Sequence, residues 1–151
     1  MSDIDMNLSA NSPLDASASA PRPALRPVQV LLVEDSPVIR DSLIDLVESD
    51  HRCMVGRTTD GETEARAALQ GHDFQIAIID LQLREGSGLN VLSWLQHQPD
   101  PPLRIVLTNF AEPRVRAQCL ALGADYFFDK SREFEEVSTA IDRYLSTLDN
   151  I

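Results

Sequence analysis

The sequence predicts an α/β fold, a doubly wound sheet of five parallel strands with helices on both faces. Between residues 28 and 148, short apolar runs alternate five times with helical patterns, which is the βα repeat of such folds. The strand runs are apolar at nearly every position, so helices have to cover both faces of the sheet. Crossovers between the strands are expected to be right-handed.

The repeat begins with a strand over residues 28–33. Ser36 and Pro37 are typical of an N-cap and a first helical residue, and they start the first helix. Its apolar face recurs at helical spacing and consists of Ile39, Leu43, Leu46 and Val47. The next elements are a weaker strand, a short helix and the glycine expected to cap it, at residues 53–58, 62–70 and Gly71.

The second half of the repeat supplies three more strands, at residues 75–80, 103–108 and 126–128. A helix over residues 88–98 is stopped by three nearby prolines and turns inward Leu89, Leu92 and Leu95. A further helix over residues 112–122 ends at Gly123. The last helix is expected to start near Ser131, which would cap it. Its buried stripe consists of Phe134, Val137, Ile141, Leu145 and Leu148.

Residues 1–27 have a different composition, with five Ser, five Ala, four Pro and no aromatic residue. Such a segment buries too little apolar surface to offset the entropy of ordering it, so a flexible tail is expected. A short partner-binding motif around Pro21 to Pro23 stays open. The folded domain is expected over residues 28–148, with 149–151 as the C-terminal end. We expect no further output domain, hence a stand-alone domain.

The net charge of the chain indicates which classes of partner it can bind. Thirteen basic and 24 acidic residues give a net charge of −11, which repels nucleic-acid phosphates and argues against a nucleic-acid-binding face. No apolar stretch is long enough to span a bilayer, and the N-terminus has no signal-peptide pattern, so we expect a cytoplasmic protein without membrane contact. In that compartment Cys53 and Cys119 are expected as reduced, buried thiols, with a disulfide as the rarer alternative.

Five polar side chains follow the predicted strands: Glu34, Asp35, Asp80, Thr108 and Lys130. The carboxyl ends of parallel strands meet at one edge of a sheet, where ligands of such folds bind. Three carboxylates together suit a hard divalent cation, Mg²⁺ above all. Asp80 is the candidate nucleophile for a phosphoryl group, whose oxygens Lys130 and the Thr108 hydroxyl would bind. Each residue alone is also compatible with no functional role: the acids as solvated loop residues, Lys130 as a surface lysine and Thr108 as a strand-end threonine. Their placement together at one sheet edge predicts a phosphorylation switch.

These residues resemble the response-regulator receiver domain (CheY-like), the phosphoacceptor half of bacterial two-component signalling. The resemblance covers residues 28–148. Glu34 and Asp35 match the acidic pair after the first strand, and Asp80 matches the phosphorylated aspartate. The remaining matches are Gly88, Thr108, the stretch 123–126, the switch aromatic Phe127, and Lys130.

The resemblance implies a flavodoxin-like (βα)5 fold with strand order 2-1-3-4-5. It also implies that Mg²⁺ binds Asp35, Asp80 and the main-chain carbonyl of Gln82 directly, and Glu34 through water. Phosphorylation of Asp80 to an aspartyl phosphate would draw Thr108 inward, and Phe127 would follow. The face of the fourth helix, fifth strand and fifth helix would then change its partner preference.

The implied function is a phosphoacceptor response regulator of a two-component or phosphorelay system. A sensor histidine kinase or histidine phosphotransfer protein would donate the phosphoryl group, meeting the first helix at Val38, Ile39 and Arg40. The output would be contact with an unidentified protein, and a phosphorylation-dependent homodimer stays open. We expect no conventional enzyme activity beyond Mg²⁺-dependent self-phosphorylation from small phosphodonors and autodephosphorylation.

The sequence departs from the family pattern near the site. The usual Met-Pro after the aspartate is replaced by Leu83 and Arg84, of which Leu83 keeps the packing and Arg84 is expected to loosen the loop. Ser131 replaces the proline that usually follows the lysine. Access to the phosphoryl group would be modulated by Gln82, Asn109 and Phe110. Bulky Phe110 is expected to slow dephosphorylation.

Three other functions are compatible with parts of this pattern. A haloacid-dehalogenase-type phosphatase would need an acid two residues after Asp80, where this chain has Gln82. A flavin or nucleotide module would need a Gly/Ser-rich loop after the first strand, where Glu34 and Asp35 would repel phosphate. A constitutive receiver-fold binding module, not regulated by phosphorylation, is the main alternative, although this chain keeps all five site positions.

Overall fold

The computed structural model describes residues 26–149 and shows one parallel sheet of five strands. The strands are β1 (Val28–Val33), β2 (Cys53–Thr59), β3 (Ile76–Ile79), β4 (Leu103–Thr108) and β5 (Tyr126–Asp129). Their order is β2-β1-β3-β4-β5, and every neighbouring pair is parallel. The predicted doubly wound fold and its strand order 2-1-3-4-5 are confirmed.

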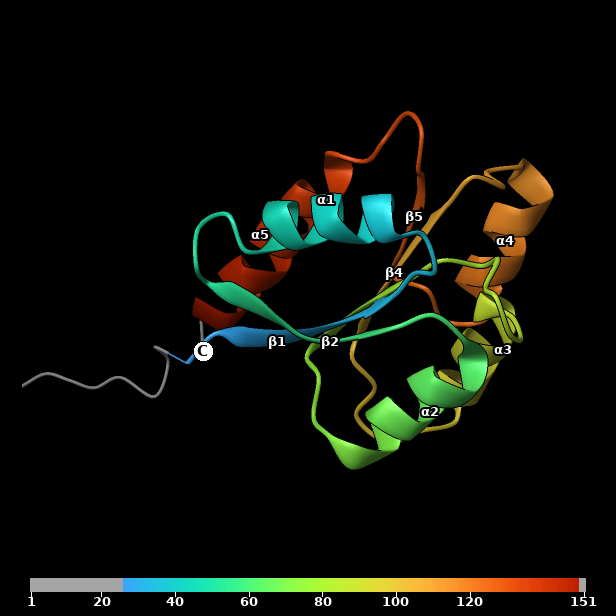
Figure 1. Cartoon of the computed structure of the whole chain (residues 1–151), viewed down its shortest axis with the longest axis horizontal. Coiled ribbons are helices and arrows are strands. Elements are labelled where there is room, and N and C mark those ends of the chain that lie inside the picture. The colour runs from blue at the N-terminus through green and yellow to red at the C-terminus, as the bar shows by residue number, and fades with distance from the viewer. Residues whose placement is uncertain (1–25, 150–151) are drawn as a thin grey trace, which may run out of the picture.

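Five helices cover the two faces of the sheet. They are α1 (Pro37–Val47), α2 (Glu62–Gly71), α3 (Gly88–Gln96), α4 (Pro113–Ala121) and α5 (Glu136–Asp149). Figure 1 shows α1 and α5 on one face and α2, α3 and α4 on the other. Because side chains alternate along a strand, Val30 and Leu32 pack under α1 and α5, whereas Leu31 and Val33 pack under the other helices. All four are fully buried, which explains why the strand runs are continuously apolar.

The start of α1 agrees with the prediction. The Ser36 side chain accepts a hydrogen bond from the Ile39 N–H, and Pro37 is the first helical residue. At the end of α2, however, Gly71 is the last helical residue, and the C-cap is His72 in an extended conformation. The predicted glycine cap is therefore wrong.

The last helix starts later than predicted. It begins at Glu136, because the chain after β5 is held in a turn around Asp129. The Asp129 carboxylate accepts hydrogen bonds from both the N–H and the hydroxyl of Ser131, and the Asp129 carbonyl accepts one from the Glu133 N–H. Ser131 therefore belongs to a turn and does not cap the helix. At the other end Leu148 is exposed, so the predicted buried stripe ends at Leu145.

Two buried thiols lie in the two halves of the core, Cys53 of β2 beside α1 and α5, and Cys119 on the buried side of α4. Both cysteines are free, as predicted. Burial raises the pKa of each thiol to about 11.

Because the pKa of both buried thiols is raised, we expect the protein to lose stability at high pH. Between pH 9 and pH 11 the unfolded chain has lost its thiol protons and the folded chain still holds them. The free energy of unfolding should therefore fall across that window, by about 2 kcal/mol per thiol. Urea unfolding at pH 8 and pH 10.5 measures the fall. A variant with both Cys53→Ala and Cys119→Ala should lose most of the dependence; a wild-type slope retained in that variant would contradict the assignment.

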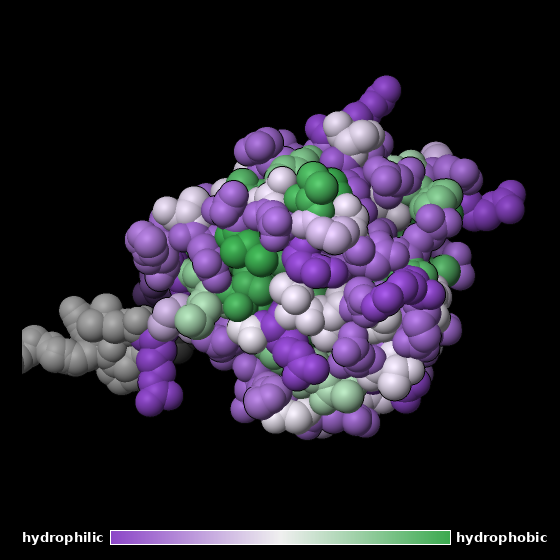
Figure 2. Space-filling model, in the orientation of Figure 1, coloured by the Kyte–Doolittle hydropathy of each residue, from purple (hydrophilic) through white to green (hydrophobic). Residues whose placement is uncertain are grey.

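Within residues 26–149 no helix is both long and apolar enough to cross a membrane. Figure 2 shows one face of the molecule as mostly hydrophilic, with small hydrophobic patches. The predicted tail over residues 1–27 lies outside the described residues except for its last two positions, and so does its Pro-rich motif.

Candidate functional site

The main chain places three of the predicted site residues by extending the sheet one residue past its strands. The Glu34 N–H donates to the Thr59 carbonyl at the end of β2, and the Asp80 N–H donates to the Val33 carbonyl at the end of β1, each at 2.9 Å. The Lys130 N–H likewise donates to the carbonyl of Thr108 at 2.9 Å. Neighbouring strands therefore fix where these three residues lie, and all three lie at one edge of the sheet.

Lys130 lies between two buried carboxylates. Its Nζ atom donates to Asp80 Oδ2 at 2.8 Å and to Glu34 Oε1 at 2.9 Å. The exposed fractions of the three side chains are 7%, 7% and 3% for Lys130, Asp80 and Glu34. Lys130 is also the single lysine among the 13 basic residues of the chain. The Lys130 ammonium thus bridges the carboxylates of Glu34 and Asp80.

Burial and pairing shift the pKa values of Glu34 and Lys130 in opposite directions. Burial raises the pKa of Glu34, and hydrogen bonds from Lys130 and the Ser36 N–H offset only part of that rise. For Lys130, burial alone would lower the pKa, but the hydrogen bonds to Asp80 and Glu34 and the charges of both carboxylates raise it overall. Lys130 is therefore held in its charged form.

The acidic cluster could hold a metal ion. Carboxylate oxygens of Glu34, Asp35 and Asp80 all lie within 4.8 Å of one another. Three carboxylates face one ammonium, which leaves an excess of negative charge that a divalent cation would neutralise. An all-oxygen donor set of this kind suits a hard cation. The residues present therefore fit the ion that the sequence predicts.

The cluster opens into a depression at the sheet edge, and most of the predicted site residues line it. The lining residues include Glu34, Asp35, Asp80, Gln82, Asn109 and Lys130. Thr108, Phe110 and Phe127 are not among them. The Thr108 side chain is fully buried, and its hydroxyl accepts a hydrogen bond from the Phe110 N–H at 3.2 Å. Phe127 is 5% exposed and packs with the residues under α2, α3 and α4.

The loop after β3 is more tightly held than expected. Leu83 packs against the core, in agreement with the prediction. Arg84 forms an ion pair with Asp60 in the loop after β2, and its N–H donates to the Asp60 carbonyl at 3.3 Å. The expectation that Arg84 loosens this loop is therefore wrong, because its side chain and main chain both tie the loop to its neighbour.

Two arginines support the site in ways that sequence reasoning missed. Arg40 on α1 donates from Nη2 to the main-chain carbonyl of Glu34 at 3.0 Å, which holds the acidic turn against the helix. Arg116 on α4 donates from Nη1 to the carbonyl of Phe127 at 3.3 Å, which ties α4 to β5. The sequence gives no signal for either contact, because both acceptors are main-chain atoms of other elements.

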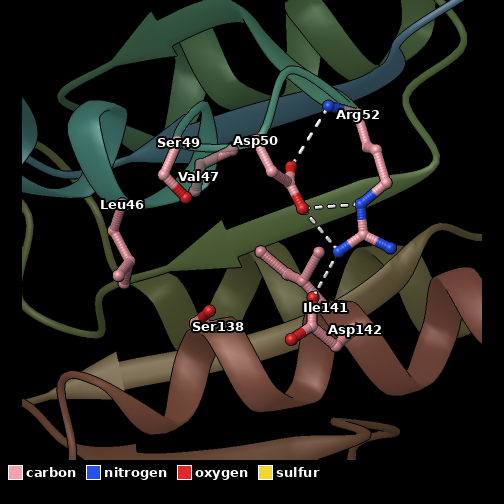
Figure 3. Close-up of a pocket in the computed structure, with 8 residues that line it drawn as sticks. All are labelled: Leu46, Val47, Ser49, Asp50, Arg52, Ser138, Ile141 and Asp142. Carbon is pink, nitrogen blue, oxygen red and sulfur yellow. Dashed lines mark hydrogen bonds and ion pairs between the residues drawn. The ribbon is translucent and has the colours of Figure 1, made fainter.

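A second, small pocket lies at the other end of the sheet, before β2 begins (Figure 3). It lies between the turn after α1 and helix α5, and an exposed ion-pair group forms part of its wall. Arg52 donates to Asp50 and to Asp142, each at 2.6 Å, and hydrogen bonds from Arg52 lower the pKa of Asp50. The group joins α5 to the α1–β2 turn and contains no candidate nucleophile, so we assign it a structural role.

Comparisons with known proteins agree with this geometry. The family model described as "Response regulator receiver domain" matches residues 30–142. The transcriptional regulatory protein YdfI of Bacillus subtilis is 29% identical over 115 residues, which are 76% of this chain and 53% of that protein. The chain thus spans about half the length of this curated relative, and about a third of others.

Solved structures show the same fold. The signal receiver domain of a signal transduction histidine kinase from Syntrophus aciditrophicus is 28% identical, with a TM-score of 0.70 over 82% of this chain and 93% of that one. The phosphorylated cyanobacterial phytochrome response regulator RcpA superposes with a TM-score of 0.71 at 19% identity, over 80% of this chain and 96% of that one. The match over most of the chain, together with the shared fold, establishes that the chain belongs to the response regulator receiver domain family.

Proposed function

We propose that this chain is the phosphoacceptor of a two-component or phosphorelay system, that it accepts the phosphoryl group on Asp80, and that it signals through protein–protein contacts. One observation carries the proposal. Asp80 is a buried strand-end carboxylate that is paired with a buried lysine, adjoins two further carboxylates and lines an open depression. That arrangement suits phosphoryl transfer, in which a protein contributes positioning and charge neutralisation.

The transfer would use the oxygen of Asp80 that Lys130 leaves available. Lys130 binds Oδ2, and Oδ1 has no hydrogen-bond or ion-pair partner among residues 26–149. Oδ1 would attack the phosphorus of a phosphohistidine, forming an O–P bond as the N–P bond breaks and the electron pair returns to the imidazole. Lys130 would then pair with the phosphoryl oxygens. Mg²⁺, held by Asp35, Asp80 and the Gln82 carbonyl with Glu34 through water, would neutralise the charge that gathers there.

The switch would run through Thr108 and Phe127. In this structure the Thr108 hydroxyl accepts a hydrogen bond from the Phe110 N–H, and Thr108 is fully buried and does not line the depression. Its hydroxyl would therefore have to move toward the depression to donate to a phosphoryl oxygen. Phe127 is already buried, and its carbonyl is held by Arg116. Movement of Thr108 would therefore act on the packing around Phe127 and on the position of α4.

The partners follow from the exposed surface. Val38 at the start of α1 is 74% exposed beside the depression, which supports this helix as the surface for a histidine kinase or phosphotransfer protein. The output partner is a protein rather than nucleic acid, on the basis of the net charge of −11. A cytoplasmic location and a phosphorylation-dependent homodimer are parts of the same proposal. YdfI is named a transcriptional regulatory protein, and this chain spans 53% of its length.

Hydrogen exchange with a phosphoryl mimic separates the switch from a constitutive binding module. Beryllofluoride with Mg²⁺ should slow amide exchange in the strand-end loops and change it in α4 and β5, because binding at Asp80 biases the state of Thr108 and Phe127. Asp80→Ala should abolish both effects. Slower exchange at the loops with no change in α4 and β5 would favour the constitutive module.

The lifetime of the phosphorylated form tests how the two residues after β4, Asn109 and Phe110, affect dephosphorylation. Asn109 lines the depression, whereas Phe110 is 41% exposed and does not. We expect Asn109→Ala to shorten the lifetime several-fold, because it opens the path of the hydrolytic water, and Phe110→Ala to shorten it less. Loss of the phosphoryl adduct over time, followed by intact mass after the donor is removed, gives both rates. An unchanged or longer lifetime in Asn109→Ala would contradict this reading.

A further inference from the structure

The loop after β3, residues 81–87, lies beside the loop after β2, residues 60–61, and the two are joined by main-chain contacts. Gly61 and Glu85 form a parallel bridge, and the Glu62 N–H donates to the Glu85 carbonyl at 2.8 Å. Within the first loop, Gln82 and Ser87 form an antiparallel bridge. The segment that carries the Gln82 carbonyl is therefore folded on itself and attached to its neighbour.

Glu85 and Glu62 add side-chain hydrogen bonds between the same two segments, one glutamate in each direction. Glu85 accepts hydrogen bonds from the N–H of Thr63 at 3.0 Å and from its hydroxyl at 3.1 Å, in the first turn of α2. The N-cap of α2, Gly61, has no side chain to do this, so Glu85 serves the helix from the other loop. In return, Glu62 accepts from the Ser87 N–H at 3.1 Å and from Asn90 Nδ2 at 3.0 Å at the start of α3.

Each glutamate also packs over a glycine of the opposite loop. A side chain at Gly61 would come within 2.8 Å of Glu85 Oε1 and 3.2 Å of its Cβ. A side chain at Gly86 would overlap Glu62, and Gly86 has a φ of +77°, which favours glycine. Gly61 thus leaves room for Glu85 of the other loop, and Gly86 leaves room for Glu62 at the start of α2. The fit is specific in shape as well as in hydrogen bonding.

A third contact fastens the same pair of helices. Arg66 on α2 lies over the Trp94 ring on α3, with its Cζ atom 5.4 Å from the ring centroid, and its Nη1 is 3.8 Å from Glu62 Oε2. The loops, the helix starts and the helix faces are therefore joined side by side. This matters for the acidic cluster because the joined loop begins directly after Asp80 and contains Gln82.

We propose that Glu62 and Glu85 form a reciprocal latch that positions the Gln82 carbonyl and the Asp80 main chain for the cation, so that both glutamates set the Mg²⁺ affinity without touching the ion. They are positioning residues. The inference rests on the proposed function, in which this edge of the sheet holds Mg²⁺. Residues that orient ligands in this way typically change metal affinity by about 10- to 100-fold when they are removed.

The test uses the full chain with Glu85→Ala and Glu62→Ala, with Glu85→Gln as a conservative variant. Glu64→Ala is the matched control, because Glu64 is exposed in the same turn of α2 and makes no side-chain hydrogen bond or ion pair within residues 26–149. Amide hydrogen exchange of the metal-free proteins reports whether loop 81–87 is held. Calorimetric titration with MgCl2 reports the affinity, and urea unfolding reports global stability.

We expect each alanine variant to speed exchange in residues 82–87 and to weaken Mg²⁺ binding by about tenfold. Glu85→Gln should show intermediate effects because its amide oxygen can still accept from Thr63, and Glu64→Ala should bind as wild type does. Because the latch is reciprocal, the double variant should lose little more affinity than either single variant.

The outcomes separate this inference from the function on which it rests. If wild type binds Mg²⁺ and the alanine variants bind it equally well, the latch is overturned while the proposed function stands. Unchanged exchange in residues 82–87 would also overturn it. If wild type shows no Mg²⁺ binding, the proposed cation site itself fails and the latch fails with it, even where exchange shows that the loop is held.

Discussion

Replacing Gly88 with alanine is expected to lower the free energy of unfolding by about 3 kcal/mol and to weaken phosphoryl acceptance at the neighbouring Asp80. Gly88 opens α3 and is packed against the main chain that follows β3. A Cβ atom there would overlap the Asp80 carbonyl oxygen and lie 2.8 Å from Leu81 Cα and 2.9 Å from the Asp80 carbonyl carbon. These are main-chain atoms, so no side chain can rotate away. Either α3 or the Asp80 main chain has to move.

Urea unfolding measures the effect on stability, and Gly71→Ala is the matched control. A Cβ at Gly71 meets nothing within 4 Å, and the residue is helical, so alanine there should stabilise slightly, by up to about 1 kcal/mol. The two substitutions are chemically identical and should have opposite signs. A Gly88→Ala variant as stable as wild type would contradict the close packing of α3 on the Asp80 carbonyl.

The second large effect is expected from Lys130→Met, which should destabilise the metal-free protein by about 3–5 kcal/mol. The substitution keeps most of the side-chain volume but removes the cation between Glu34 and Asp80, whose side chains are 3% and 7% exposed. Two buried carboxylates would then lie side by side with no cation between them, and only the Ser36 N–H would still donate to Glu34. Saturating Mg²⁺ should recover part of the loss, because a divalent cation supplies the missing positive charge.

Thermal or urea unfolding with and without Mg²⁺ tests this prediction, and Arg132→Met serves as control because Arg132 is an exposed cation in the following turn. The control should change stability by less than about 0.5 kcal/mol. A Lys130→Met variant that is as stable as the control in metal-free buffer would show that the pairing at this edge does not hold the carboxylates.

The strands and the location of the site follow from the sequence because strong local signals specify them. The apolar run over residues 28–33 has no competing interpretation, and the observed β1 has the predicted bounds. The site residues directly follow such runs, so predicting the strands also predicts the edge at which Glu34, Asp80 and Lys130 meet. The sequence could not show that Lys130 pairs with both carboxylates, because that depends on side-chain directions after the strands.

The errors arise where a local hydrogen-bonded turn or a contact between loops decides the structure. Phe134 continues the apolar period of α5, but the Asp129 turn holds the chain until Glu136. The sequence predicts that Arg84 loosens its loop, but the neighbouring loop supplies Asp60 as its partner. Contacts between loops far apart in sequence have no periodic pattern, so the sequence also does not reveal how Glu62 and Glu85 join theirs.

The central claim is that Asp80 accepts a phosphoryl group. The most direct test is the intact mass of the protein after incubation with acetyl phosphate, in Mg²⁺ and in EDTA, for wild type and Asp80→Asn. We predict one phosphoryl adduct on wild type in Mg²⁺, and none in EDTA or on the variant. Two results would contradict this claim. One is a phosphoryl adduct of equal yield on Asp80→Asn. The other is no adduct on a folded wild type that binds Mg²⁺, either with acetyl phosphate or with a phosphorylated histidine kinase as donor.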